Sequence, residues 1–166
     1  FLPDIAVDEG AVINFTATAS DSDVPVNNIN FALGAGSPAG ASIDSLTGEF
    51  NWTVTEAQGP GVYTIYVLAG DDGEPPLLGG ASFTVSVAEI NSAPILGALP
   101  VQAITEGGSL SVTIPVSDPD LPSNRLIFSL EPGAPSGVAL NPLTGALSWA
   151  SGEVDGPLNV QIPIRV

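Results

Sequence analysis

One set of short motifs occurs twice in this sequence, and the second copy lies 97 positions after the first (118 − 21 = 97). A period this long is typical of whole domains joined in tandem, because solenoid repeats have periods of about 20–50 residues. Five motifs recur at this shift: Glu9-Gly10 as Glu106-Gly107, Asp21-Ser22-Asp23 as Asp118-Pro119-Asp120, Phe31 as Phe128, Leu46-Thr47-Gly48 as Leu143-Thr144-Gly145, and Trp52 as Trp149.

The repeat predicts two domains, residues 1–93 and 94–166, joined by the segment Ala88–Ile95. The sequence has no Met, and Leu2-Pro3 aligns with Leu99-Pro100, so we expect a processed or excised part of a longer protein. Val166 aligns with Ala69, so the second domain lacks a counterpart of residues 70–88 and hence its last strand. Two explanations stay open: the chain simply ends there, or a neighbouring chain donates the strand.

Apolar residues alternate with polar ones through most of the chain, which predicts short β-strands and no helices. Pro- and Gly-rich turns such as GAGSPAGAS and DDGEPP separate these runs. The pattern is typical of antiparallel β-sandwiches. The residues predicted to face inward include Ile13, Phe15, Ala17 and Ala19; Phe50, Trp52 and Val54; Tyr63, Ile65, Val67 and Ala69; Leu126, Phe128 and Leu130; Leu147 and Trp149; and Val160, Ile162, Ile164 and Val166.

The charge balance is strongly acidic, with 18 Asp and Glu, two Arg, no Lys and no His, for a net charge of −16. Such a surface repels nucleic acids and anionic membranes and favours cations. Because 44% of the residues are hydrophobic, the chain is not a disordered acidic tail and has material for packed cores. No run of apolar residues is long enough to predict membrane insertion, and without Cys there are no disulfides.

Two pairs of carboxylates, Asp21 with Asp23 and Asp118 with Asp120, follow inward-facing strands where the chain leaves the sheet. Carboxylates two residues apart in a loop can turn toward one hard cation, although Asx turns use the same residues. Asn27 or Asn28, and Asn124, follow closely and could add carbonyl oxygens. Asp71 should end its strand at the same end of the sandwich as Asp21, and Glu9 should lie toward the opposite end. We therefore predict calcium at the Asp pairs.

Several stretches resemble cadherin repeats. Ala69–Leu77 looks like their A-x-D-x-G-x-P-x-L stretch, Ser42–Gly48 like their I-D-x-x-T-G turn, and Glu89–Pro94 like their D-x-N-D-N-x-P linker. The Asp pairs match D-x-D, and Glu9 and Glu106 match the acidic residue of the first strand. The resemblance spans the chain and is closer to the divergent cadherin-like, immunoglobulin-like repeats of large microbial surface proteins. It implies two tandem Greek-key sandwiches at a cell surface or outside the cell.

The resemblance also implies calcium bound between consecutive repeats. The implied junction site has Asn91, Asp118, Asp120 and the Asn124 carbonyl, with Glu9 and Glu89 nearby. The same site atop the first domain has Asp21, Asp23, Asn27 or Asn28, and Asp71. The cadherin D-R-E motif is missing, with Glu56 and Glu153 as weak substitutes, and the linker has Ser92 and Ala93 where the family has Asp and Asn. We therefore expect at most one Ca²⁺ per junction, bound in the millimolar range.

Two further features concern carbohydrate. Asn14-Phe15-Thr16 and Asn51-Trp52-Thr53 are glycosylation sequons, and the alternation puts both Asn side chains on an outward strand face. Trp52 and Trp149 could serve as platforms for a sugar, but their inward positions in both copies favour a role in the core.

Catalysis is not expected, because the chain has no His, Cys or Lys to act as base or nucleophile. We predict a non-catalytic adhesive or spacer segment of a longer extracellular repeat protein. Its partners are its neighbouring repeats, and calcium stiffens the junction between them. Two alternatives stay open. The chain could be a filament or surface-layer subunit that receives a strand from an identical neighbour, or a spacer of a secreted polysaccharide-degrading enzyme.

Overall fold

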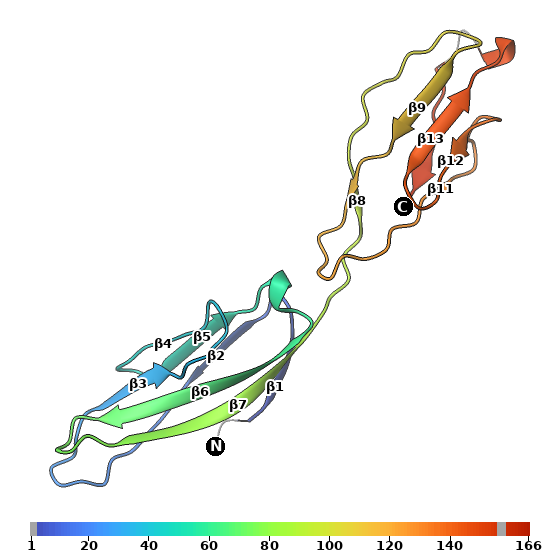
Figure 1. Cartoon of the computed structure of the whole chain (residues 1–166). Coiled ribbons are helices and arrows are strands. Elements are labelled where there is room, and N and C mark those ends of the chain that lie inside the picture. Colours follow the sequence, from blue (N-terminus) through green and yellow to red (C-terminus); the bar gives the residue numbers. More distant parts are fainter. Residues whose placement is uncertain (1–2, 156–158) are drawn as a thin grey trace. The chain divides into compact units, whose positions relative to one another are not determined.

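The chain is an all-β protein in the computed structural model, which describes residues 3–155 and 159–166 (Figure 1). The residues divide into two compact units, with the boundary between Ile90 and Asn91. The two helices in the described ranges are single 3₁₀ turns, and none is long and apolar enough to cross a membrane.

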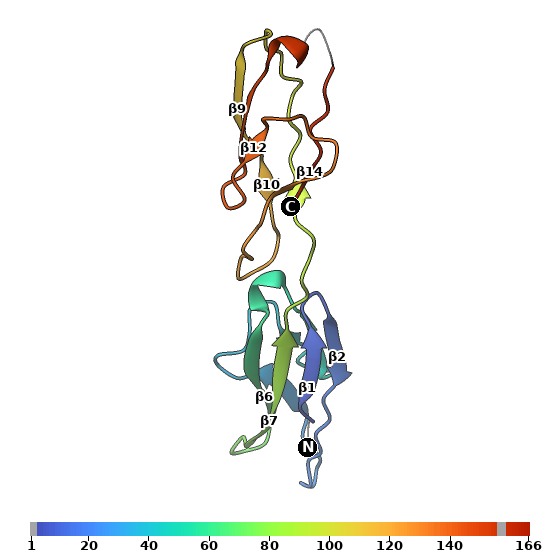
Figure 2. The ribbon, with the colours of Figure 1, turned by 90° about the vertical axis from the view of Figure 1, so that its right-hand side faces the viewer.

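Unit 1 is a sandwich of two sheets with strand orders β1-β7-β6-β3 and β2-β5-β4. Strand β1 runs parallel to β7, while the other pairs are antiparallel, and Figure 2 shows β1 beside β7. The elements are β1 (Ile5–Asp8), β2 (Val12–Thr16), β3 (Ile29–Leu33), β4 (Ser42–Ile43), β5 (Glu49–Thr53), η1 (Glu56–Gln58), β6 (Gly61–Asp71) and β7 (Leu78–Ala88).

The core of unit 1 lies between these sheets and is built by the alternation that the sequence shows. Phe50 and Trp52 of β5 are fully buried, and the ring of Phe50 stacks on Phe15 with centroids 4.8 Å apart. Burial of Trp52 confirms its predicted core role. The prediction for Ala19 was wrong: β2 ends at Thr16, and Ala19 is exposed in the loop that follows. The chain leaves the sheet after the Ala17 N–H donates to the Gly48 carbonyl at 2.8 Å.

Unit 2 repeats much of this plan. Strands β9, β12 and β13 and the turn η2 lie 97 positions after β2, β4, β5 and η1, and the three strands form a sheet in the order β12-β13-β9. Its buried core comprises Ile114, Phe128 and Leu147, and Trp149 is 8% exposed. The elements are β8 (Ile95–Leu96), β9 (Ser109–Thr113), β10 (Val116–Ser117), β11 (Ser129–Leu130), β12 (Ala139–Leu140), β13 (Ala146–Ala150), η2 (Glu153–Asp155) and β14 (Ile164–Arg165).

The predicted strand from Val160 to Val166 is mostly absent. Only Ile164–Arg165 forms a strand, and Val160 is 39% exposed. Pro163 has no N–H to donate to a ladder, so the strand begins after it. In unit 1 the corresponding strand β6 lies between β3 and β7, whereas β14 pairs with β11 alone among the described strands.

Candidate metal centre

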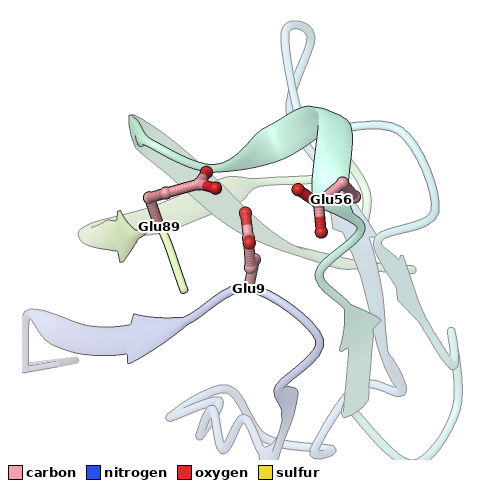
Figure 3. A group of neighbouring side chains, drawn as sticks. All are labelled: Glu9, Glu56 and Glu89. Carbon is pink, nitrogen blue, oxygen red and sulfur yellow. The ribbon is translucent and has the colours of Figure 1, made fainter. Parts of the chain in front are cut away.

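Three glutamates meet at the end of unit 1 where β7 finishes. Glu9 lies in the turn after β1, Glu56 begins η1, and Glu89 follows β7 directly. One carboxylate oxygen of each lies within 4.8 Å of the other two, and Figure 3 shows the three carboxylates pointing toward one another. Glu9 is 8% exposed, while Glu56 and Glu89 are half-buried.

The parallel pairing of β1 and β7 brings Glu9 and Glu89 together. Asp8 pairs with Ala88, and the Glu9 N–H continues the ladder by donating to the Ala88 carbonyl at 3.0 Å. The turn after Glu9 places Gly10 at φ 76°, where a glycine is favoured. Thus two residues that are 80 positions apart in the sequence (89 − 9 = 80) become neighbours through backbone hydrogen bonds.

The 3₁₀ turn η1 positions the third carboxylate. Gln58 accepts a hydrogen bond from the Thr55 backbone N–H at its side-chain oxygen, at 2.9 Å, and donates through Nε2 to the Ala39 carbonyl at 3.0 Å. Tyr63 also donates through its hydroxyl to the Gln58 carbonyl at 2.9 Å. These bonds tie the turn at both ends, so Glu56 is held on a fixed backbone.

Glu9 is the most confined member of the cluster. Its Oε1 accepts the Ile90 N–H at 3.1 Å, but its buried Oε2 has no hydrogen-bond donor within the described ranges. Burying a carboxylate oxygen without a partner is costly, on the order of 1–3 kcal/mol or more. Three ionised carboxylates at this separation also repel one another, by about 1 kcal/mol per pair in water and about 3 kcal/mol near a protein surface. A cation among them would relieve both costs.

The other candidate residues of unit 1 lie at the far end of the eleven-residue strand β6. Asp21 and Asp71 line one pocket of about 250 Å³. Asp71 Oδ1 accepts the N–H groups of Gly73 at 3.0 Å and Leu77 at 2.9 Å, which closes the loop between β6 and β7. The Asp23 N–H donates to Asp21 Oδ1 at 2.6 Å, as in an Asx turn. The structure therefore brings Asp21 near Asp71.

Asn28, a predicted ligand of this site, is hydrogen-bonded to Asp72. Its side-chain amide and its backbone N–H both donate to Asp72, each at 2.8 Å, and these two bonds hold the pKa of Asp72 below its ordinary value. Asn27, and not Asn28, approaches Asp23, with Nδ2 at 3.4 Å from Oδ2. A metal site at this pole stays a prediction.

The candidate residues of unit 2 form one hydrogen-bonded group. Asp120 is fully buried, and its two carboxylate oxygens lie 3.0 and 3.1 Å from the Ser92 backbone nitrogen. Asn124 Nδ2 donates to Asp120 Oδ2 at 2.7 Å and to Asn91 Oδ1 at 3.0 Å. Asp118 Oδ1 accepts the Asp120 N–H at 3.0 Å. All four predicted ligand residues of this unit are thus brought together, and side-chain oxygens of Asn91, Asp118 and Asp120 accept N–H donors.

The sequence-based prediction names Glu56 only as a weak substitute for the missing D-R-E motif, and it does not name Asp72 as a candidate. Both follow motifs that the sequence does show, since Glu56 comes directly after the strand that carries Trp52, and Asp72 adjoins Asp71. The counterparts of Glu9 and Glu56 in unit 2, Glu106 and Glu153, are both exposed. The three-glutamate cluster is therefore a feature of unit 1.

The two sequons lie side by side on the outer face of the sheet β2-β5-β4. Asn14 of β2 and Asn51 of β5 are directly paired in the register, and both side chains are exposed, as the alternation predicts. Glycosylation at either Asn stays a prediction.

Comparison with known proteins gives the family. Residues 2–88 and 93–164 each match the family described as "Putative Ig domain". The chain belongs to this family. Mouse protocadherin Fat 4 is 34% identical over 133 residues, which cover 72% of this chain and 2% of that protein. Rat protocadherin-16 is 28% identical over 181 residues, which cover 91% of this chain and 5% of that protein. The chain thus spans a small part of the relatives it matches.

Solved structures show the same fold. Human CDH23 EC21-23 has a TM-score of 0.52 at 18% identity, and the match covers 98% of this chain and 59% of that one. Human protocadherin-24 EC1-2 has a TM-score of 0.50 at 13% identity, covering 99% and 89%. The chain is therefore a tandem of Ig-like β-sandwiches with the fold seen in these cadherin structures.

Proposed function

We propose that this chain is an adhesion or spacer segment of a longer extracellular protein, and that unit 1 binds one calcium ion at Glu9, Glu56 and Glu89. The observation that carries the proposal is the buried Oε2 of Glu9, which has no donor in the described part of the chain and lies among two further carboxylates.

Calcium suits this cluster better than other common metals. Its ligands in proteins are oxygens, several of them carboxylates, whereas zinc and copper favour the His and Cys that this chain lacks. Calcium takes about 6–8 oxygen ligands, so three glutamates would leave positions for water. A site with few protein ligands is expected to be weak, with a Kd of about 10⁻⁴–10⁻³ M as in other extracellular modules.

A cation bound at this cluster would restrain the last residues of unit 1. Glu89 and Ile90 are the last residues of the unit, and the Ile90 N–H already donates to Glu9 Oε1 at 3.1 Å. Binding of Glu89 and Glu9 to one ion would hold this exit segment against β1 and reduce its freedom. In the assembled protein this would limit bending after unit 1, which is the mechanical role that we propose.

Thermal unfolding with and without calcium tests the proposal. Calcium at about ten times its Kd should stabilise unit 1 by about 1.4 kcal/mol, which corresponds to a rise in Tm of about 5–10 °C. Glu56→Gln should abolish most of this rise. The matched control is Glu153→Gln, which changes the corresponding exposed residue of unit 2 and should leave the rise intact. An equal Tm in EGTA and in calcium would refute the proposed site.

One observation favours a second function, that of a filament subunit completed by a strand from an identical neighbour. Strand β14 pairs with β11, and no other strand in the described part of the chain pairs with its second edge. An open edge can accept an added strand. Electron microscopy of the concentrated chain tests this, because particles that stay monomeric under all conditions would reject it. No observation on the structure favours the role of spacer in a polysaccharide-degrading enzyme.

A further inference from the structure

The Asp118–Asp120 loop of unit 2 matches the D-x-D motif, which in cadherin repeats implies calcium. The contacts of its carboxylates decide whether a cation fits there. A calcium ligand must present a lone pair to the ion, at about 2.3–2.6 Å. Asp120 is fully buried, and both of its carboxylate oxygens face the Ser92 N–H at 3.0 and 3.1 Å. Oδ2 also faces the Asn124 amide at 2.7 Å. Three contacts with N–H donors thus already use most of the lone pairs of this carboxylate.

The orientation of Asn124 is decisive. An ionised carboxylate only accepts hydrogen bonds, so the atom of Asn124 that lies 2.7 Å from Asp120 Oδ2 must be the NH₂ group. The same nitrogen lies 3.0 Å from Asn91 Oδ1. It therefore lies between two of the oxygens that a cation would need to share. The amide group thus places its N–H donors among these oxygens, where a cation would be repelled by their partial positive charge.

We infer that unit 2 holds its entry segment, Asn91-Ser92, by a metal-free hydrogen-bonded lock made of Asp118, Asp120 and Asn124. Asp118 Oδ1 accepts the Asp120 N–H at 3.0 Å and fixes the loop. The buried Asp120 then binds the Ser92 N–H, and Asn124 bridges Asp120 to Asn91. Two different groups of side chains would thus hold the segments at the unit boundary. The proposed glutamate cluster of unit 1 depends on a cation, and the hydrogen-bonded lock of unit 2 does not.

The corresponding motif of unit 1 differs from this lock in the burial of its acid and in the length of one contact. Asp21, Asp23 and Asn27 lie 97 positions before Asp118, Asp120 and Asn124. Asp23 is exposed, and its Oδ2 lies 3.4 Å from Asn27 Nδ2, which is longer than the 2.7 Å of the Asp120 contact. The two units therefore differ at this motif: the acid of unit 2 is buried and makes the shorter contact with its Asn.

Amide hydrogen exchange of the 166-residue chain, followed by NMR, tests the inference. In EGTA the Ser92 amide should exchange at least about tenfold more slowly than an unstructured amide. Calcium at about 10 mM, well above the Kd range of extracellular modules, should leave its rate unchanged within about twofold. An unprotected Ser92 amide in EGTA, or protection that appears only with calcium, would overturn the inference.

A pair of matched variants tests the role of the bridging amide. Asn124→Asp puts a third carboxylate where the NH₂ group lies, so the Ser92 amide should lose at least about tenfold of its protection in EGTA. Asn27→Asp makes the same change at the corresponding position of unit 1 and should leave Ser92 unaffected. Unchanged exchange in Asn124→Asp would contradict the lock. The result in EGTA does not depend on Glu9, Glu56 or Glu89, so the lock can stand or fall separately from the proposed calcium site.

Discussion

Gly59 lies so close to Glu9 that a β-carbon at position 59 would overlap Oε2 of the glutamate. It would also lie 3.2 Å from the Glu9 Cβ and 3.3 Å from its Cδ. Gly59 has φ −102°, a backbone conformation open to any residue, so the need for glycine comes from space alone. The side chain missing at Gly59 leaves the room in which the buried Glu9 carboxylate lies.

The first prediction concerns this contact. Gly59→Ala should displace the Glu9 carboxylate and lower calcium affinity by about tenfold or more, which is about 1.4 kcal/mol. It should also destabilise unit 1 by about 1–3 kcal/mol, because the added methyl overpacks a buried site. Calorimetric titration with calcium and urea unfolding measure the two effects.

The control for this variant is Gly79→Ala in β7. A β-carbon there would meet no heavy atom closer than 4.0 Å, and the residue is exposed. It should change neither calcium affinity nor stability by more than about 0.5 kcal/mol. Calcium binding that survives intact in Gly59→Ala would show that Glu9 is not a ligand.

The second prediction uses a turn that the two units build with different residues. In unit 1, Asp44 Oδ1 accepts the N–H groups of Leu46 at 2.9 Å and Thr47 at 2.8 Å. In unit 2, Asn141 Oδ1 accepts those of Leu143 and Thr144 at 2.9 and 3.1 Å. The Thr47 and Leu46 N–H groups hold the pKa of Asp44 below its ordinary value of 3.8, whereas Asn141 does not titrate.

A lowered pKa in the folded state means that Asp44 contributes stability that is fully present above pH 3.8 and is lost as the pH falls through the lowered pKa. On acidification below pH 3.8, the Leu46 and Thr47 amides should therefore lose protection relative to unstructured amides at the same pH, while the Leu143 and Thr144 amides should not. Amide exchange measured at several acidic pH values checks this. In Asp44→Asn the two turns should behave alike, and a pH response that persists in that variant would contradict the explanation.

The third prediction concerns the core of unit 1. Phe50 is fully buried, and its ring contacts Phe15 and Phe83 with centroids 4.8 and 5.8 Å away. Phe50→Ala should destabilise unit 1 by about 3–5 kcal/mol through lost burial and a cavity. Val62→Ala, on the outer face at 71% exposure, should change stability by no more than about 0.5 kcal/mol. Urea unfolding distinguishes them, and similar losses in both would contradict the assigned core.

The sequence predicts the fold well where strands have one buried and one exposed face. Phe50 and Trp52 are buried and Asn51 and Thr53 are exposed in β5, as the period-two pattern requires. The pattern was wrong at Ala19, because alternation continues in the sequence after the backbone has left the sheet. It was wrong again at Val160, because a strand also needs a partner and available N–H groups, which side-chain periodicity does not record.

The candidate site could be predicted only in part. The repeated Asp pairs predict two loops rich in side-chain oxygens, but their local pattern does not show which of these oxygens accept hydrogen bonds. Asp120 is satisfied by the Ser92 N–H from the linker, a contact between residues 28 positions apart. The cluster of Glu9, Glu56 and Glu89 depends on the parallel pairing of β1 with β7, which brings together distant parts of the chain. Neither relation is encoded in a short motif.

The last prediction separates two reasons for a glycine. Gly145 and Gly107 of unit 2 have similar positive φ angles, 67° and 71°. A β-carbon at Gly107 would meet no atom within 4 Å, whereas one at Gly145 would lie 2.8 Å from the ring of Phe128. Gly107→Ala should therefore show backbone strain alone, about 1–2 kcal/mol. Gly145→Ala should add overpacking of about 1–3 kcal/mol. Urea unfolding followed at amides of β13 measures both, and equal losses would mean that the Phe128 ring moves aside without cost.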